Sequence, residues 1–188
     1  MKYKCIYKTK DNFDDIILLS DGFYLTGLYF INSYTLPKDI DEYILKNDLD
    51  IFKDTYLYLD QYFNKEITTI KIKYKLHNIS PFTKEVLNIV LDIKYGTTIT
   101  YNDVAFIIAK KRNIKKMSNQ AIGHALSNNP ICIIIPCHRV IGKNNNLIGY
   151  SGRIKNKIEL LKLEGIDTNK LYIPNKGNKL WIDANGVI

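Results

Sequence analysis

The sequence contains only three cysteines, Cys5, Cys132 and Cys137, at irregular spacing. An odd and scattered set of cysteines excludes the disulfide-stapled scaffolds of small secreted proteins and predicts a reducing, cytoplasmic compartment. Cys132, Cys137 and His138 together offer three metal ligands, but their spacing is not of a zinc type. Because Cys5 is the only cysteine in the N-terminal part, we expect no metal there either.

Long apolar runs are also missing. No stretch reaches the roughly 18 apolar residues that a membrane helix needs. The lysines of residues 1–10 are not followed by the apolar core of a signal peptide. We therefore expect no contact with a membrane. Since 46% of the 188 residues are hydrophobic, the chain can bury a substantial core, as one large domain or as two small domains that share it.

Acidic residues are outnumbered by basic ones. The 27 Lys and Arg residues face 19 Asp and Glu residues, which gives a net charge of +8. A basic balance of this size fits nucleic-acid binding, but many proteins that never touch DNA share it. Lysine greatly outnumbers arginine, and a lysine contacts phosphate as a point charge more readily than it reads a base edge. The charge therefore permits DNA binding without identifying it.

The N-terminal part has the pattern of a small α/β unit. The apolar run Ile16–Leu19 ends at the turn Ser20-Asp21-Gly22, and a second β-like run at residues 23–31 completes a predicted hairpin. Apolar residues recur every three or four positions over residues 48–63, which predicts an amphipathic helix. Alternation over Ile67–Tyr74 predicts another strand. Nothing here has catalytic spacing, so we interpret this part as scaffold.

The C-terminal part begins with clear helix signals. Ser80 can cap a helix whose first residue is Pro81, and that helix is predicted to end at Gly96. Thr100 starts a second helix, which runs to about Arg112, and a basic connector leads to a third helix from Ser118 to about Asn128. This order is typical of a helix-turn-helix. Next come an apolar, extended segment at residues 131–135, a loop at residues 142–152 and a helix at residues 154–164.

Together these patterns predict an α/β (α+β) fold in two domains. Residues 1–77 form a small N-terminal α/β scaffold domain with a β-hairpin sheet. Residues 78–165 form a mostly helical domain that contains the helix-turn-helix. Residues 166–188 form an irregular C-terminal tail, whose Trp181 we expect to pack against the N-terminal part.

The segment Pro136-Cys137-His138-Arg139-Val140 has the composition of a reactive site. Only the thiolate of a cysteine is a good nucleophile, so a neighbouring base must take the proton of Cys137. His138 is adjacent in sequence, and a water molecule could bridge the two side chains, because neighbours in an extended chain point apart. A carboxylate would then orient the imidazole, and Glu164 is one candidate. The alternative, a merely buried thiol, is the more common one, and we assign it to Cys132.

Three blocks of sequence resemble the O6-alkylguanine-DNA alkyltransferases. They are Asn129-Pro130 with residues 133–142 around the Pro-Cys-His-Arg-Val core, Gly149-Tyr150-Ser151-Gly152, and residues 160–165. The resemblance covers about residues 80–165, and in the N-terminal part extends only to size and a turn-strand signature near residues 20–28. It implies a DNA repair protein that transfers the alkyl group of O6-alkylguanine irreversibly to its own cysteine.

The resemblance implies four catalytic roles. Cys137 is the acceptor thiolate, His138 is its base through a water molecule, and Glu164 orients His138. Tyr101 donates its hydroxyl proton to the guanine ring as the alkyl group leaves. No cofactor is implied, because the damaged DNA is itself the alkyl donor, and the stable thioether limits each molecule to one turnover.

The resemblance also implies how DNA is held. The partner is double-stranded DNA, bound through its minor groove by a monomer that flips the damaged nucleotide out of the helix. We expect Thr83, Asn102 and Lys143 to contact backbone phosphate. The small residues Ala121 and Gly123 should allow a helix to approach the DNA closely. Contacts with the flipped base or the active-site turn are expected from Val140, Ser151, Tyr150 and Asn129.

Two positions depart from the family pattern. Gln120 stands where an arginine usually fills the gap left by the flipped base, which predicts slower or weaker flipping without loss of the chemistry. Arg153 stands where a second glycine is usual. Because a positive φ is unfavourable for arginine, we expect this loop to take a different path or Arg153 to reach a phosphate, with consequences for the width of the pocket.

Three other functions fit parts of the sequence. An alkyltransferase-like protein binds lesions without repairing them, but such proteins replace the nucleophile and this chain keeps Cys137. A helix-turn-helix transcription regulator would not need the segment from Pro136 to Val140, and would normally dimerise on palindromic sites. A thiol hydrolase would need an oxyanion-hole motif, which is not evident beside the cysteine.

Overall fold

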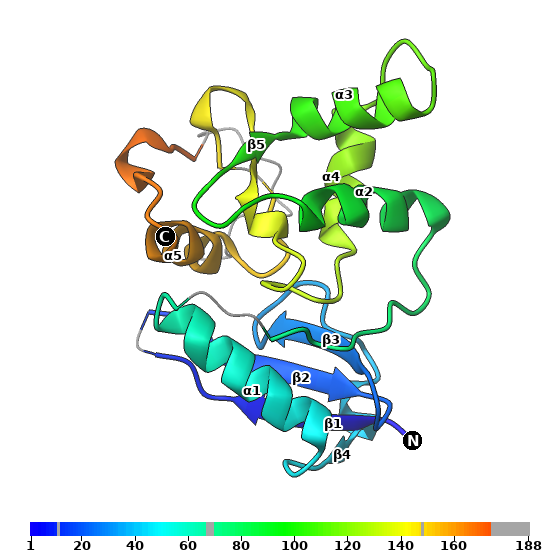
Figure 1. The fold of residues 1–188 in the computed structure, drawn as a ribbon, viewed down its shortest axis with the longest axis vertical. Helices are drawn as coiled ribbons and strands as arrows, with labels where there is room; N and C mark the ends of the chain where they lie inside the picture. The colour runs from blue at the N-terminus through cyan, green and yellow to red at the C-terminus, as the bar shows by residue number, and fades with distance from the viewer. Residues whose placement is uncertain (11, 67–69, 148, 174–188) are drawn as a thin grey trace.

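The computed structural model describes residues 1–10, 12–66, 70–147 and 149–173. Figure 1 shows two lobes, one built from a sheet and a single long helix, the other mostly from helices. The predicted α/β (α+β) class is confirmed. The predicted Trp181 contact lies outside the described residues.

The sheet of the N-terminal lobe has the strand order β3-β2-β1-β4. Both β1–β2 and β2–β3 are antiparallel, whereas β4 pairs parallel to β1. The expected hairpin therefore forms between β2 and β3, and Gly22 in its turn has a φ of +104°, which favours glycine. The strands are β1 (Tyr3–Tyr7), β2 (Ile16–Ser20), β3 (Leu25–Phe30) and β4 (Ile44–Leu45).

Strand β2 is buried on both faces, which explains its uninterrupted apolar run. Ile16 and Leu18 belong to the main core, which also contains buried side chains of α1 (Asp50–Phe63). Ile17 and Leu19 form a smaller cluster with Tyr29 on the other face. Helix α1 lies across the face of Ile16 and Leu18 (Figure 1). Its bounds agree closely with those of the helix predicted at residues 48–63.

The strand predicted at Ile67–Tyr74 does not form within residues 70–74, and residues 67–69 lie outside the described part. Only an isolated parallel bridge pairs Tyr74 with Leu25. The free edge of β3 is shared, because Leu28 on the same strand forms a bridge with Ile131. With two segments on one six-residue strand, neither can form a full ladder there.

A short 3-10 helix, η1 (Ile40–Glu42), precedes β4 in the first lobe, and the second lobe contains the α-helices after α1. Ser80 caps α2 (Pro81–Leu91) by accepting a hydrogen bond from the Thr83 N–H, Thr100 and Asp103 form a capping box at α3 (Tyr101–Lys111), and Ser118 caps α4 (Asn119–Ser127). Helices α3 and α4 pack together as the expected helix-turn-helix. The other elements are β5 (Ile99–Thr100), η2 (Cys137–Arg139), β6 (Val140–Ile141), η3 (Lys143–Asn145), α5 (Ile154–Leu163) and η4 (Thr168–Lys170).

Two further features of this lobe differ from the prediction. Helix α2 ends at Leu91, and Gly96, with a φ of +71°, belongs to the loop that follows. The segment 131–135 is a turn, not an extended strand: the Ile135 N–H donates to the Ile131 carbonyl oxygen at 3.0 Å, and Ile133 has a φ of +67°. The apolar run reflects burial of this turn, because Ile131, Ile133 and Ile135 are at most 1% exposed.

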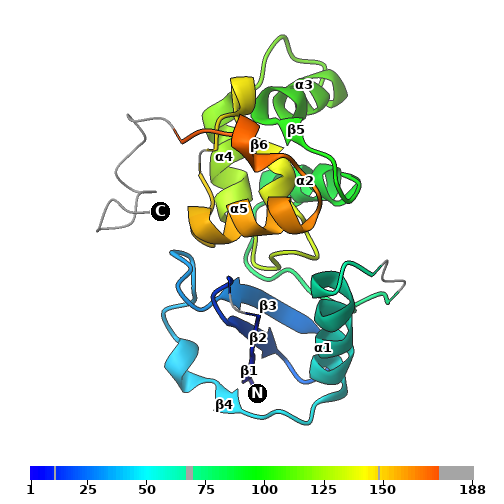
Figure 2. The same cartoon turned by 90° about the vertical axis from the view of Figure 1, so that its left-hand side faces the viewer.

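The two lobes share one hydrophobic core, which includes Leu28 and Phe30 of the sheet, Val86 of α2, Cys137 and Tyr150. Figure 2 shows α5 on the side of the helical lobe that faces the sheet. Among the described residues, no helix is long and apolar enough to cross a membrane.

Candidate active site

Cys137 lies at the start of η2, directly after the buried turn, and is 4% exposed. The side chain of Asn129, just after α4, donates to the Cys137 Sγ at 3.0 Å and to the Ile135 carbonyl oxygen at 2.9 Å. Its oxygen accepts from the Ile131 N–H at 3.0 Å. A single buried amide thus joins the end of the helix-turn-helix to the turn that carries the thiol, and it provides a donor for a thiolate.

The surroundings of Cys137 favour its ionised form. Contact with the Cys132 thiol lowers the pKa of Cys137 most strongly, burial opposes this, and the Asn129 amide and Lys157 lower the pKa further, so that it falls below its ordinary value. Cys132 is fully buried, as expected, but it also touches the reactive sulfur, which the sequence did not indicate.

Lys157 is a site residue that the sequence analysis missed. Its side chain is fully buried, its Nζ donates to the Val140 carbonyl oxygen at 2.7 Å, and burial lowers its pKa to about 8. A signal was present, because Lys157 shares the buried stripe of α5 with Leu160, Leu161 and Glu164 at helical spacing. A lysine on such a stripe is rarely buried without a specific partner.

His138 and Glu164 meet in the core, as the resemblance implies. His138 is 0% exposed, and its Nε2 lies 2.8 Å from Glu164 Oε1. Because a carboxylate only accepts, Nε2 carries the hydrogen and Nδ1 is left as the acceptor. Nδ1 has no hydrogen-bond partner among the described residues. Burial lowers the pKa of His138, although the bond to Glu164 opposes this, so the ring is neutral and can accept a proton.

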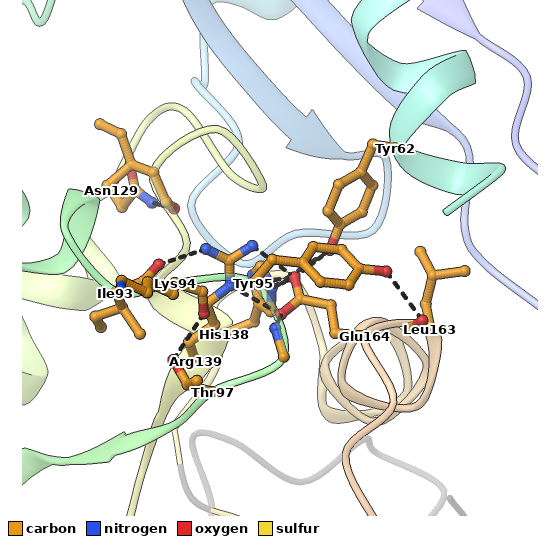
Figure 3. A network of polar contacts seen from close by, with 12 residues as sticks. Tyr62, Ile93, Lys94, Tyr95, Thr97, Asn129, His138, Arg139, Leu163 and Glu164 are labelled. Atoms are coloured by element: carbon orange, nitrogen blue, oxygen red, sulfur yellow. Dashed lines mark hydrogen bonds and ion pairs between the residues drawn. The ribbon is translucent and has the colours of Figure 1, made fainter. Parts of the chain in front are cut away.

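Glu164 is the centre of a larger network (Figure 3). Tyr62 of α1 donates its hydroxyl to Oε1 at 2.7 Å, and Arg139 donates Nη2 to Oε1 and Nε to Oε2, each at 2.8 Å. Arg139 also donates Nη1 to the Ile93 carbonyl oxygen at 2.6 Å. Burial alone would raise the pKa of Glu164, but the bonds from His138 and Arg139 hold it well below its usual range.

Tyr101 is the first residue of α3 and donates its hydroxyl to the Gly149 carbonyl oxygen at 3.1 Å. Burial and the nearby Cys137 raise the pKa of Tyr101, so the phenol keeps its proton at neutral pH. A Cβ on Gly123 of α4 would lie 3.8 Å from the Tyr101 ring. The Tyr101 side chain therefore lies between α4 and the loop that contains Tyr150 and Ser151.

That loop is buried and closely packed. Tyr150 and Ser151 are each 2% exposed. A Cβ on Gly152 would lie 2.8 Å from the rings of both Phe30 and Tyr150, so only glycine fits without a shift. The premise that arginine avoids a positive φ does not hold here, because Arg153 adopts a φ of +72°. The Arg153 side chain reaches a protein group in this structure, because its Nε donates to the Asn32 carbonyl oxygen at 2.6 Å.

The residues expected to hold DNA divide between surface and interior. Gln120 is exposed on α4, Asn102 on α3 and Lys143 on η3, while Ala121 is half-buried. Asn102 accepts a hydrogen bond from Asn119. The exposed positions are at the N-terminal halves of the two helices or on η3.

Thr83 is the exception among the expected phosphate contacts. It is 5% exposed, and its hydroxyl accepts a hydrogen bond from Ser80 at 3.0 Å. Thr83, Ala121 and Asn129 line a cavity of about 500 Å³ that also touches β3 and the segment 77–80. Cys137 is not in its lining, so we do not assign this cavity to the reacting base.

Comparison with known proteins finds similar sequences. The family model for the DNA-binding domain of 6-O-methylguanine DNA methyltransferase matches residues 81–166. A methylated-DNA–protein-cysteine methyltransferase of Methanosarcina acetivorans is 36% identical over 141 residues, which cover 74% of this chain and 86% of that protein. A protein of the same name from Mycobacterium leprae is 35% identical over 149 residues, covering 79% and 85%.

Comparison with solved structures finds chains of similar fold. The O6-methylguanine methyltransferase of Mycobacterium tuberculosis is similar with a TM-score of 0.74 and 29% identity, over 87% of this chain and 93% of that one. The same enzyme in complex with DNA gives a TM-score of 0.75 and 28% identity, over 90% and 94%.

Proposed function

This chain belongs to the methylated-DNA–protein-cysteine methyltransferase family, and on that basis we propose that it removes the alkyl group from O6-alkylguanine in DNA and keeps it on Cys137. The observation that carries the proposal is the buried Cys137 thiol, which accepts a hydrogen bond from Asn129 next to the His138–Glu164 pair. The test is the mass of the intact protein after reaction with a lesion duplex, where one alkyl group per chain is expected.

The thiolate is generated first. The Cys137 proton passes to His138 Nδ1 through a bridging water molecule, since Nε2 is committed to Glu164. Glu164 is kept ionised by Arg139 and Tyr62, so it stabilises the imidazolium that forms. Lys157 and the Asn129 amide stabilise the thiolate before the substrate arrives.

Alkyl transfer then follows as a displacement. Sγ of Cys137 attacks the alkyl carbon, the bond from that carbon to O6 breaks, and its electron pair stays on guanine. Tyr101 donates a proton to the guanine ring, which makes guanine a better leaving group. The products are unmodified guanine in DNA and a stable thioether on Cys137, so each molecule acts once.

The target base must leave the helix to reach Cys137, because a stacked base is inaccessible to a buried thiol. We propose that a monomer places α4 in the minor groove, where half-buried Ala121 and Gly123 allow close approach. Val140, Tyr150 and Ser151 hold the flipped base, while Asn102, Lys143 and Thr83 contact or support the DNA backbone. In this scheme the domain at residues 78–165 binds DNA and reacts, and the domain at residues 1–77 supports it.

Replacing Gln120 tests the flipping step. Gln120→Arg should raise the single-turnover rate on duplex DNA by about tenfold and on single-stranded DNA far less, because a charged finger stabilises the gap only when a base must leave a stack. Rates on the same lesion in both forms of DNA measure this. Equal acceleration on the two substrates would refute the role of Gln120 in flipping.

Replacing Lys157 tests the pH dependence. In the wild type the rate should rise with pH and level off with a midpoint below the ~8.5 of a free thiol. Lys157→Met removes a positive charge that favours the thiolate, so the pKa of Cys137 rises and the midpoint should move to higher pH. The exposed neighbour Lys155→Met is the matched control. An equal midpoint in both variants would show that Lys157 does not stabilise the thiolate.

A further inference from the structure

The loop of Tyr150 and Ser151 is attached to the N-terminal lobe by a set of contacts that we call the clamp. Its members are Ser151 and Arg153 on one side and Asn32, Ser33 and Tyr34, just after β3, on the other. The Ser151 carbonyl oxygen accepts from the Tyr34 N–H at 2.9 Å and from Ser33 Oγ at 3.0 Å. Arg153 Nε donates to the Asn32 carbonyl oxygen at 2.6 Å, and its guanidinium lies 3.7 Å from the centre of the Tyr34 ring.

The backbone of Arg153 shows that this contact stabilises an unfavourable conformation. Arg153 has a φ of +72°, a conformation that strains a residue with a Cβ but not glycine. Such strain persists only where surrounding contacts hold the residue in place. The fork of the guanidinium does so, because it can hydrogen-bond a carbonyl and stack on an aromatic ring at once.

The clamp acts on a wall of the reaction site. From Gly149 to Gly152 the loop packs against Tyr101 at one end, through the bond to the Gly149 carbonyl oxygen, and against Phe30 at the other. Tyr150, between these ends, shares the core with Cys137. Its far end is held to residues 32–34, so an outward movement of this wall would have to break the clamp contacts.

We propose that Arg153 is a positioning residue that sets the size of the alkyl group this protein accepts, by holding the loop 149–152 against Asn32–Tyr34. The inference rests on the proposed alkyl transfer and adds to it a limit on the substrate. Methyl fits behind the clamped loop, whereas a benzyl group needs the loop to move away from Cys137.

The experiment compares single-turnover rates on two duplexes, one with O6-methylguanine and one with O6-benzylguanine. Arg153→Gly removes the side chain and the strain together, Tyr34→Leu removes the stacked ring, and the double variant closes a cycle. The control is Lys155→Ala, which removes an exposed positive charge two residues away. DNA affinity is measured in parallel, as a function of salt.

In the clamp variants, the ratio of the benzyl rate to the methyl rate should rise about tenfold. The double variant should gain no more than either single change, since both release the same loop. Amide hydrogen exchange at residues 149–152 should accelerate in both variants and stay unchanged in Lys155→Ala. DNA affinity should be the same in all proteins.

An unchanged rate ratio in Arg153→Gly, with methyl transfer intact, would overturn the clamp. So would a loss of salt-dependent DNA affinity in Arg153→Gly but not in Tyr34→Leu, because Arg153 would then be a phosphate contact. Failure of the wild type to accept any alkyl group would instead contradict the proposed function. The exchange measurement would still decide the clamp in that case, since unchanged exchange at residues 149–152 overturns it without any reaction.

Discussion

Glu164→Gln should slow alkyl transfer by at least about 100-fold and destabilise the protein by about 3–5 kcal/mol. The substitution keeps the size of the side chain but removes the charge that Arg139 and His138 share. Arg139 would remain with its guanidinium largely buried and without a carboxylate, which is the costly way to break an ion pair. His138 would lose the group that fixes its tautomer and stabilises its protonated form.

The rate and the unfolding free energy are measured on the same preparation, so that a folding defect is not mistaken for a catalytic one. Glu159→Gln, on the helix that ends just before Glu164, is the control, because its bond to Lys162 at 2.8 Å is a surface pair. That control should cost less than about 1 kcal/mol. If Glu164→Gln behaved like Glu159→Gln in both measurements, Glu164 would have no role in organising the site.

Tyr101→Phe should reduce the transfer rate by about 100-fold, the usual scale for loss of a general acid. The structural alternative is that the hydroxyl only holds the loop through Gly149. Loss of one neutral hydrogen bond is worth about 1 kcal/mol, or roughly fivefold. The size of the effect therefore distinguishes proton donation from positioning.

Tyr95→Phe provides the matched control, since the Tyr95 hydroxyl also donates to a backbone carbonyl oxygen, that of Leu163, at 3.1 Å. Tyr95 is 45% exposed and lies outside the reacting groups, so its variant should retain nearly the full single-turnover rate. Comparable, small losses in both variants would remove Tyr101 from the chemistry and leave it as a support for the loop.

Local signals made much of the fold predictable. Ser80, Thr100 and Ser118 mark the starts of three helices, and each side chain forms the cap that its type and position predict. The hairpin was readable because a turn separates two β-like runs. These features depend on neighbours within about four residues, which is the range over which a sequence pattern is informative.

The errors arise from contacts that the periodicity of the sequence does not reveal. The turn at residues 131–135 was predicted as extended because its burial resembles that of a strand, whereas the amide of Asn129 holds both of its ends. The strand predicted up to Tyr74 is limited to one bridge because Ile131 occupies the same edge of β3. No local pattern contains the competition between two segments for one edge.

The site was predictable in its reactive centre and less so in its surroundings. The order Cys137-His138 and the position of Glu164 were evident from the resemblance, and the structure brings His138 and Glu164 within 2.8 Å. Lys157 and the partners of Arg153 were not foreseen, because each is defined by a residue far away in sequence. The pKa of Lys157 and the hydrogen-bond partner of Arg153 depend on which distant segments the fold brings together.

Cys137 itself is the residue that we expect to accept the alkyl group. The measurement is the mass of the intact wild-type protein after mixing with an excess of duplex that contains one O6-methylguanine, beside Cys137→Ser and Cys132→Ser. We expect a single added methyl group in the wild type and in Cys132→Ser, located on the peptide that contains Cys137, and none in Cys137→Ser. Tight binding of the lesion duplex with no added mass on the wild type would contradict this expectation and identify a protein that binds damage without repairing it.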